Sequence, residues 1–419
     1  MGGIITHQRK LKQNKTIKDI MSDSHSHHHA AHPRRVFAKP MRARSPDEQP
    51  RASTPLELLF DLVFVVAVAF AGAGLHHALA EGHVVHGLQS YGVMFAVIWW
   101  AWMNFSWFAS AYDTDDVLYR LTVFVQLLGA LVIAAGMPSA FDGNFVIGTV
   151  GYTLMRVGTV AQWLRAAKND PARRVTNMRY AKGIMAVQLC WIANLFLAPY
   201  TGLVTFVLFF ALELLIPLWA ERSAQTSWHA EHIAERYGLF TIIVLGESIL
   251  SASSALQAGM AAGQWNLALV WIALGGALIV FTMWWLYFDE PAHHLLTSTK
   301  AAFFWGYAHF FVFSSAAAVG AGLAVAVDHA TGQAHISEMA AGAAVAVPVA
   351  VYVLSLWFVH ERHRARSMFE QYLFPVGALL ILGTPLLYAT VIWVGLLMSV
   401  MLAMKLFVSC SDPEKMHAK

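Results

Sequence analysis

A few ionisable side chains stand in long apolar stretches of the sequence, where an unpaired charge is costly. Such groups bind cations, carry protons or pair with one another across helices. With about 1.5 Å of rise per residue, Glu247 lies about 18 Å along a helix from Glu235. Glu213, Arg156 and His309 each lie about 12–13 Å from the nearest flanking charge. The sequence therefore predicts Glu247, Glu213 and His309 as ion- or proton-handling candidates.

Glu247 shares one face of its expected helix with Arg236, since the two lie about three turns apart. Ser251 and Ser254 continue this face, which makes a polar stripe across most of a bilayer. Two interpretations remain open. Glu247 either coordinates a cation or carries a proton, or it forms a buried ion pair with Arg156 that fixes helix packing. In the first case, Arg156 and Arg236 are the candidate counter-charges.

Glu57 and Asp61 lie one turn apart near the start of another apolar run. Ser53 or Thr54 is expected to cap this helix, and Pro55 suits its first turn. Glu57 then favours the positive end of the helix dipole, which explains it as a cap. Asp61 lies a turn deeper among apolar side chains, and capping does not explain it. Both are ion-handling candidates, and Asp61 is the stronger.

Histidines offer metal or proton chemistry at three places. Two clusters are His25, His27, His28, His29 and His32 in the N-terminal tail, and His76, His77, His83 and His86 with Glu81 further on. Neither has the cysteines or the fixed spacing of a defined metal site, so the metal is unknown and no cofactor is expected. His309 stands among Trp305 and Phe310, where a neutral, hydrogen-bonded packing role competes with proton handling.

The composition places these residues in a membrane. Of 419 residues, 58% are hydrophobic and only 13% are charged, with a net charge of +3. Soluble domains carry about a quarter charged residues. These values exclude a disordered protein, a nucleic-acid binder and a disulfide scaffold. The expected partner is the lipid bilayer, with a cation or proton as the mobile species and an undetermined oligomeric state.

The expected fold is an all-α, polytopic transmembrane helical bundle of about 12 spans, because apolar runs of bilayer length recur along the chain. The runs are 56–79, 91–112, 119–137, 145–164, 183–199, 202–220, 234–254, 266–288, 301–326, 339–359, 370–387 and 389–408.

The positions of Lys and Arg predict how the chain is oriented in the membrane, since these residues gather in cytoplasmic loops. Residues 1–51 form a basic, His-rich segment that is expected to be a disordered cytoplasmic tail, and 410–419 a second, short one. Loop Lys and Arg residues fall only on every second connection between spans. Both termini are therefore predicted to be cytoplasmic.

Two pairs of segments suggest an internal repeat. Both 55–64 and 235–244 place an acid near their start, followed by an aromatic-aliphatic run, and 107–113 and 284–289 both end in aromatics and Asp. Six spans per half would give two parallel repeats in one orientation. The expected division is 52–228 and 229–409.

Enzyme signatures are absent from the sequence: there is no Gly-rich phosphate loop, no Gly-x-Ser-x-Gly elbow and no Cys-x-x-Cys pair. Whether the protein is an enzyme stays uncertain on these grounds.

Three segments resemble the bacterial low temperature requirement A (LtrA) proteins: 54–64 (TPLELLFDLVF), 102–113 (WMNFSWFASAYD) and 235–247 (ERYGLFTIIVLGE). The resemblance covers about residues 52–408 and implies a multi-pass protein of the bacterial inner membrane, linked by name to growth in the cold. It brings no established substrate. It does single out the polar members of these segments: Glu57, Asp61, Asn104, Asp113, Glu235, Arg236 and Glu247.

The leading functional hypothesis is a transporter or channel-like protein with a polar path that handles a cation or proton. One alternative is an integral-membrane enzyme that acts on lipid or an isoprenoid. Another is a membrane stress sensor or scaffold, which would rest on the basic tail binding anionic lipid.

Overall fold

The computed structural model describes residues 36–45, 52–364 and 367–410, and these residues form helices and no strand. The all-α prediction is confirmed. The long helices are α2 (Pro55–Ala80), α3 (Val84–Tyr112), α4 (Val117–Phe141), α5 (Val146–Asn169), α6 (Arg174–Ala220), α7 (Ala230–Ala261), α8 (Leu267–Phe288), α9 (Thr299–Ala330), α10 (Glu338–Val359), α11 (Met368–Gly383) and α12 (Thr390–Cys410). Short 3-10 helices are η1 (Pro171–Arg173), η2 (His293–Leu295), η3 (Glu361–His363) and η4 (Thr384–Leu386).

Gly202 divides α6 into two helical segments. Its φ of 47° and ψ of −122° are non-helical, and a glycine adopts positive φ at little cost. With α6 divided there, the described helices correspond one to one with the predicted apolar runs. Ten of them are long and apolar enough to cross a membrane, and α5 and the part of α6 before Gly202 are not in that set. A multi-span membrane protein is thus confirmed.

The start of α2 shows how the sequence fixes a helix end. The Thr54 side chain accepts a hydrogen bond from the Glu57 amide, and the Glu57 carboxylate accepts one from the Thr54 amide at 2.7 Å. This reciprocal capping box satisfies two amides that the helix itself leaves free. The predicted cap is confirmed, and it holds Asp61 one turn further in.

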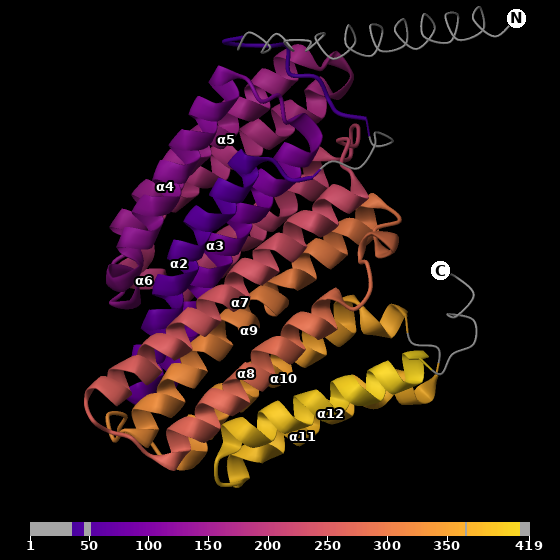
Figure 1. Ribbon diagram of the computed structural model, residues 1–419. Coiled ribbons are helices and arrows are strands. Elements are labelled where there is room, and N and C mark those ends of the chain that lie inside the picture. The colour runs from indigo at the N-terminus through magenta and orange to yellow at the C-terminus, as the bar shows by residue number, and fades with distance from the viewer. Residues whose placement is uncertain (1–35, 46–51, 365–366, 411–419) are drawn as a thin grey trace, which may run out of the picture.

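The helices lie side by side in one bundle (Figure 1), with α4 and α5 at one edge and α11 and α12 at the opposite edge. Near the centre, α2 packs against α3, α4, α7 and α9, so the first apolar helix contacts both parts of the chain. We call one end of the bundle the cation-free end, because its connections (81–83, 142–145, 262–266 and 331–337) hold no Lys or Arg. The opposite end, with the connections 113–116, 170–173, 221–229 and 289–298, is the cation-rich end, because Lys and Arg lie in these connections or in the helix turns beside them: Arg120, Lys168, Arg173, Arg222 and Lys300.

Helix pairing recurs along the chain. The contacts of α2 with α4, α4 with α5 and α5 with α6 have counterparts in α7 with α9, α9 with α10 and α10 with α11. This recurrence supports our proposal that 52–228 and 229–409 are two related halves. The assignment of the cation-rich end to the cytoplasm stays a prediction.

Close contact between α4 and α5 depends on glycine. A Cβ added to Gly151 would lie 2.6 Å from the Ile133 amide nitrogen, and one added to Gly129 would lie 2.6 Å from the Gly151 carbonyl oxygen. Both distances are well inside van der Waals contact, so only glycine permits this approach. The packing fixes the rotation of α5, which carries Tyr152 and Arg156.

Residues 36–45, inside the predicted tail, pack against the cation-rich end. Met41 is fully buried, the Leu118 amide donates to the Phe37 carbonyl at 3.0 Å, and the Arg44 amide donates to the Ala111 carbonyl at 3.0 Å. This short stretch therefore differs from the solvated tail that its composition predicts, because an apolar side chain and backbone hydrogen bonds anchor it. The rest of the predicted tails, at 1–35, 46–51 and 411–419, lies outside the described residues.

Candidate functional site

Asp61 of α2 and Arg236 of α7 form a bidentate ion pair. Arg236 Nη1 donates to Asp61 Oδ2 at 2.7 Å, and Nη2 donates to Oδ1 at 2.5 Å. Trp102 Nε1 of α3 adds a third hydrogen bond to Oδ1 at 2.7 Å. Both charged side chains have no exposed surface. The pair therefore joins α2 and α3 to α7 in a geometry that suits a planar guanidinium.

Aromatic rings enclose this pair. The Trp102 ring stacks on Phe240 with centroids 4.4 Å apart, and Phe60 stacks on Phe105 at 3.7 Å. All four rings are buried. Ser106 Oγ lies 3.4 Å from Arg236 Nη2, and the two charges are stabilised mainly by each other and by Trp102.

Glu57 and Glu235 connect the first turns of α2 and α7. Glu57 Oε1 lies 3.0 Å from His232 Nε2, and both side chains are buried. The Ser53 amide donates to Glu235 Oε1 at 3.2 Å. These contacts and the Asp61–Arg236 pair hold α2 and α7 together over their first two turns.

A second deep ion pair joins Arg156 of α5 to Glu213 in the second part of α6. Arg156 Nη2 donates to Glu213 Oε2 at 2.8 Å and also contacts the Tyr152 hydroxyl. The indole Nε1 of Trp100 donates to the same carboxylate oxygen at 2.9 Å. The other oxygen, Oε1, accepts from the Tyr152 hydroxyl and from Trp191 Nε1, each at 3.2 Å. Four donors thus saturate a carboxylate that is 1% exposed.

A cavity of about 490 Å³ opens beside this second pair. It lies among α3, α4, α5 and both parts of α6, and its exposed rim is at the cation-free end, around Gln89 and Asn144. Tyr152 and Trp191 line it. Since both also donate to Glu213, one layer of side chains separates the cavity from the carboxylate.

The two pairs can do different chemistry. Protonation of either carboxylate would remove the negative half of its ion pair and leave the arginine charge buried without a counter-charge. Near Asp61, stacked aromatic rings line the pair. Near Glu213, a shift of Tyr152 or Trp191 would expose the carboxylate to the cavity.

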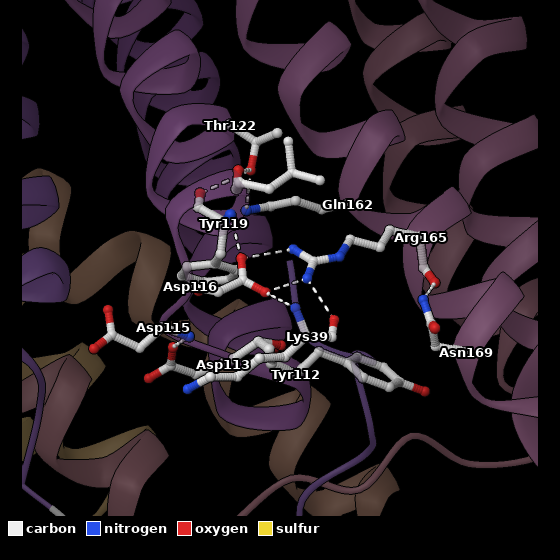
Figure 2. A network of polar contacts seen from close by, with 12 residues as sticks. Lys39, Tyr112, Asp113, Asp115, Asp116, Tyr119, Thr122, Gln162, Arg165 and Asn169 are labelled. Carbon is white, nitrogen blue, oxygen red and sulfur yellow. Dashed lines mark hydrogen bonds and ion pairs between the residues drawn. The ribbon is translucent and has the colours of Figure 1, made fainter. Parts of the chain in front are cut away.

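A third polar network lies outside the spans, at the cation-rich end (Figure 2), and sequence reasoning missed it. Asp116 caps α4 by accepting from the Tyr119 amide at 2.8 Å, and it also accepts from the Lys39 amide at 2.7 Å. Arg165 of α5 donates to both carboxylate oxygens. Burial alone would raise the pKa of Asp116, but the Arg165 guanidinium and the two amides outweigh it and lower that pKa.

The three quoted segments carry the contacts around Asp61 and Arg236, and a comparison of whole sequences agrees. The family model for the bacterial low temperature requirement A protein (LtrA) matches residues 52–406. The chain belongs to the LtrA family.

This LtrA-family chain is also 29% identical to the uncharacterized protein RA0937 of Rhizobium meliloti (strain 1021) over 253 residues. That alignment covers 58% of this chain and 59% of the relative. No solved structure matches the chain.

The remaining polar residues of the LtrA segments lie apart from the ion pairs. Asn104 Nδ2 donates to the Trp100 carbonyl of its own helix at 2.7 Å. Asp113 follows the last residue of α3 and accepts from the Asp115 amide at 3.2 Å. Asn104 thus positions α3 locally, while Asp113 closes its C-terminal end.

Glu247 is the deep acid of the LtrA segments that lies away from both guanidinium groups. It is half-buried in α7, next to turns whose Ile242 and Leu250 are 46% and 60% exposed. The alternative that Glu247 pairs with Arg156 is wrong, because Arg156 pairs with Glu213. The expected stripe runs from the buried Arg236 to this partly exposed position.

His309 of α9 is fully buried and hydrogen-bonded on both ring nitrogens. Its Nδ1 lies 2.8 Å from the Trp305 carbonyl oxygen, and its Nε2 lies 3.1 Å from the Tyr287 hydroxyl. This is the geometry expected for a packing histidine. Its part in ion handling stays a prediction.

Metal-binding geometry does not appear among the described residues, which bring together no three His, Cys, Asp or Glu side chains in a suitable group. His76 Nε2 instead lies 2.7 Å from Asp328 Oδ2, and His86 Nε2 lies 2.9 Å from the Phe141 carbonyl oxygen. The tail histidines from His25 to His32 lie outside the described residues.

Sequence reasoning also missed Tyr152, Trp100 and Trp191, which bind Glu213. One signal could have found Tyr152. It precedes Arg156 by four residues, which places both side chains on one helical face.

Proposed function

We propose that this LtrA-family protein is a transporter whose substrate reaches the cavity among α3, α4, α5 and α6, with a proton as the coupling ion. The observation that carries this proposal is the position of the cavity, which ends at Tyr152 and Trp191, two of the four side chains that bind Glu213. A deep carboxylate beside a cavity is the arrangement that proton-coupled carriers need.

Glu213 is the ion-handling acid in this proposal, with Arg156 as its counter-charge. A proton that enters through the cavity would neutralise Glu213 and weaken its pair with Arg156. Tyr152 and Trp191 would then be free to rotate, because the carboxylate they bind no longer carries a charge. Proton binding and the shape of the cavity are coupled in this way.

Asp61, Glu57 and Arg236 have a different part. They join α2 to α7, and so the two proposed halves, at a place that the cavity does not reach. We propose that this contact is the pivot between the halves. Glu247, half-buried in α7, is the second candidate for proton exchange, and His309 is a packing residue beside the pivot.

The protein would lie in the bacterial inner membrane with both termini in the cytoplasm. The cavity would then open on the opposite, external side. The support for this orientation is the cation-free end, where the rim of the cavity lies.

The test is dissipation of a pH gradient in proteoliposomes that contain an internal pH dye. The parent protein should collapse the gradient faster than protein-free liposomes, and Glu213→Gln should abolish that excess rate. Glu338→Gln, at an exposed position in the first turn of α10, is the matched control and should behave as the parent does.

Two outcomes would overturn the proposal. One is a parent rate equal to that of protein-free liposomes. The other is a folded Glu213→Gln variant, with the helical circular dichroism of the parent, that dissipates the gradient at the parent rate.

A further inference from the structure

The lining of the cavity restricts the chemistry of what can bind there. Its walls are mostly apolar, with Val93, Met94, Ile133, Met137 and Phe206 among them. None of its described lining residues is Asp, Glu, Lys, Arg or His. An ion bound in such a site would lose its water without gaining an opposite charge, which is strongly unfavourable.

One polar group in the wall lacks a partner. The Oδ1 atom of Asn194, in the first part of α6, is buried and accepts no hydrogen bond within the described part of the chain. An amide oxygen in that state is costly until a donor reaches it. Asn194 lines the cavity, so a donor inside the cavity would satisfy it.

From these two observations, we infer that the cavity binds an uncharged amphipathic molecule, with an aliphatic body and a hydroxyl or amide N–H that donates to Asn194 Oδ1. The volume of about 490 Å³ is within the range of sites that enclose small organic ligands. The inference rests on the proposed transport function only for the role of this molecule as substrate. Binding itself is independent of transport.

The chain offers a precise way to block the cavity. Gly148 lines it in the first turn of α5, and a Cβ at this position would meet no atom within 4 Å. Gly148→Phe should therefore fill the cavity without disturbing the backbone. Gly72→Phe is the matched control, since Gly72 of α2 has the same open surroundings and lies outside the cavity.

The experiment is photolabelling of the full chain in proteoliposomes by four diazirine probes that share one twelve-carbon chain. They end in a hydroxyl, a methyl ether, an ammonium and a carboxylate. Mass spectrometry compares labelling within 133–152, which lines the cavity, with labelling of the exposed face of α11 around Leu379. This ratio cancels differences in how the probes partition into the membrane.

For the alcohol probe, we expect the ratio of cavity labelling to α11 labelling to exceed that of the ether probe by about fivefold, which is the effect of one hydrogen bond. It should exceed the ammonium and carboxylate ratios by at least about tenfold. Asn194→Leu should bring the alcohol down to the ether. Gly148→Phe should abolish the excess labelling, and Gly72→Phe should leave it unchanged.

Each contrary result overturns a defined part of the binding inference. Equal labelling by alcohol and ether, or an unchanged Asn194→Leu variant, removes the donor requirement. A charged probe that labels as well as the alcohol removes the uncharged class. Labelling that survives Gly148→Phe removes the cavity as the site. Selective labelling without any proton flux would overturn the proposed transport and leave the binding site standing.

Discussion

Asp61–Arg236 and Glu213–Arg156 are both arginine–carboxylate pairs that also accept an indole N–H, yet they differ in access. Stacked aromatic rings enclose the first pair on all the helices that form it. The second pair lies one side chain away from a cavity that opens at the cation-free end. The first also joins distant parts of the chain, whereas the second lies within one proposed half.

The difference shows that depth in a membrane does not decide what a carboxylate does. Both acids are almost completely buried, and both accept from a guanidinium and an indole N–H. What separates them is the packing around the pair: stacked aromatic rings enclose Asp61, whereas one layer of side chains divides Glu213 from a cavity. Three experiments test this contrast.

The largest effect is expected at Asp61. Asp61→Leu should lower the free energy of unfolding by about 3–5 kcal/mol, because it leaves the Arg236 guanidinium buried and unpaired. The double variant Asp61→Leu/Arg236→Met should recover most of that loss, since it removes both charges. Titration with sodium dodecyl sulfate, followed by circular dichroism, measures both. A single variant as stable as the parent would mean that water reaches Arg236.

A smaller effect is expected at the second pair. Glu213→Gln should lower the free energy of unfolding by about 2 kcal/mol, the usual loss for a charge-assisted hydrogen bond. The reason for the smaller loss is that water in the cavity can approach Arg156 once Tyr152 moves. The same titration with sodium dodecyl sulfate measures this loss of unfolding free energy, with Glu338→Gln as the control variant. A loss as large as that of Asp61→Leu would contradict the contrast in access.

The smallest effect on stability is expected at Asp116. It lies outside the spans and pairs with Arg165, so it serves as a reference for an ion pair near water. Its pKa in the folded protein is lowered, chiefly by the Arg165 guanidinium against the opposing effect of burial. A lowered pKa adds stability above the unfolded value of about 3.9, and this gain is lost as the pH falls through the folded value. The parent should therefore lose stability below about pH 4 more steeply than Asp116→Asn.

Unfolding titrations between pH 3 and pH 6 measure this difference for both proteins. Asp142→Asn, at an exposed carboxylate after α4, should keep the pH dependence of the parent. If the unfolding free energies of the parent and of Asp116→Asn change with pH in parallel, Arg165 does not hold Asp116 ionised.

The sequence predicts the fold well, for a physical reason. A helix that crosses a bilayer is apolar over most of its length, so apolar runs in the sequence mark the spans. The predicted cap at Thr54 was equally local, because it depends on four consecutive residues. The break after α11 was marked by Gly383 and Pro385, and the structure has η4 there.

Which carboxylate pairs with which arginine could not be predicted in the same way. Arg156 binds Glu213 and not Glu247, and this depends on which helices are neighbours and how each is rotated. The close approach of Gly129 and Gly151 sets that rotation, and nothing in the spacing of charges reports it. The cavity is harder still to predict, because it is the space that side chains of four helices fail to fill.

The contact between Asp61 and Arg236 has a consequence for how the chain is made. The two residues are 175 positions apart, so a ribosome adding about 5–20 residues per second produces the arginine about 9–35 seconds after the aspartate. Until α7 emerges, the carboxylate of Asp61 lacks its guanidinium partner. Nascent proteins truncated before α7 should therefore be preferred targets of membrane quality-control proteases.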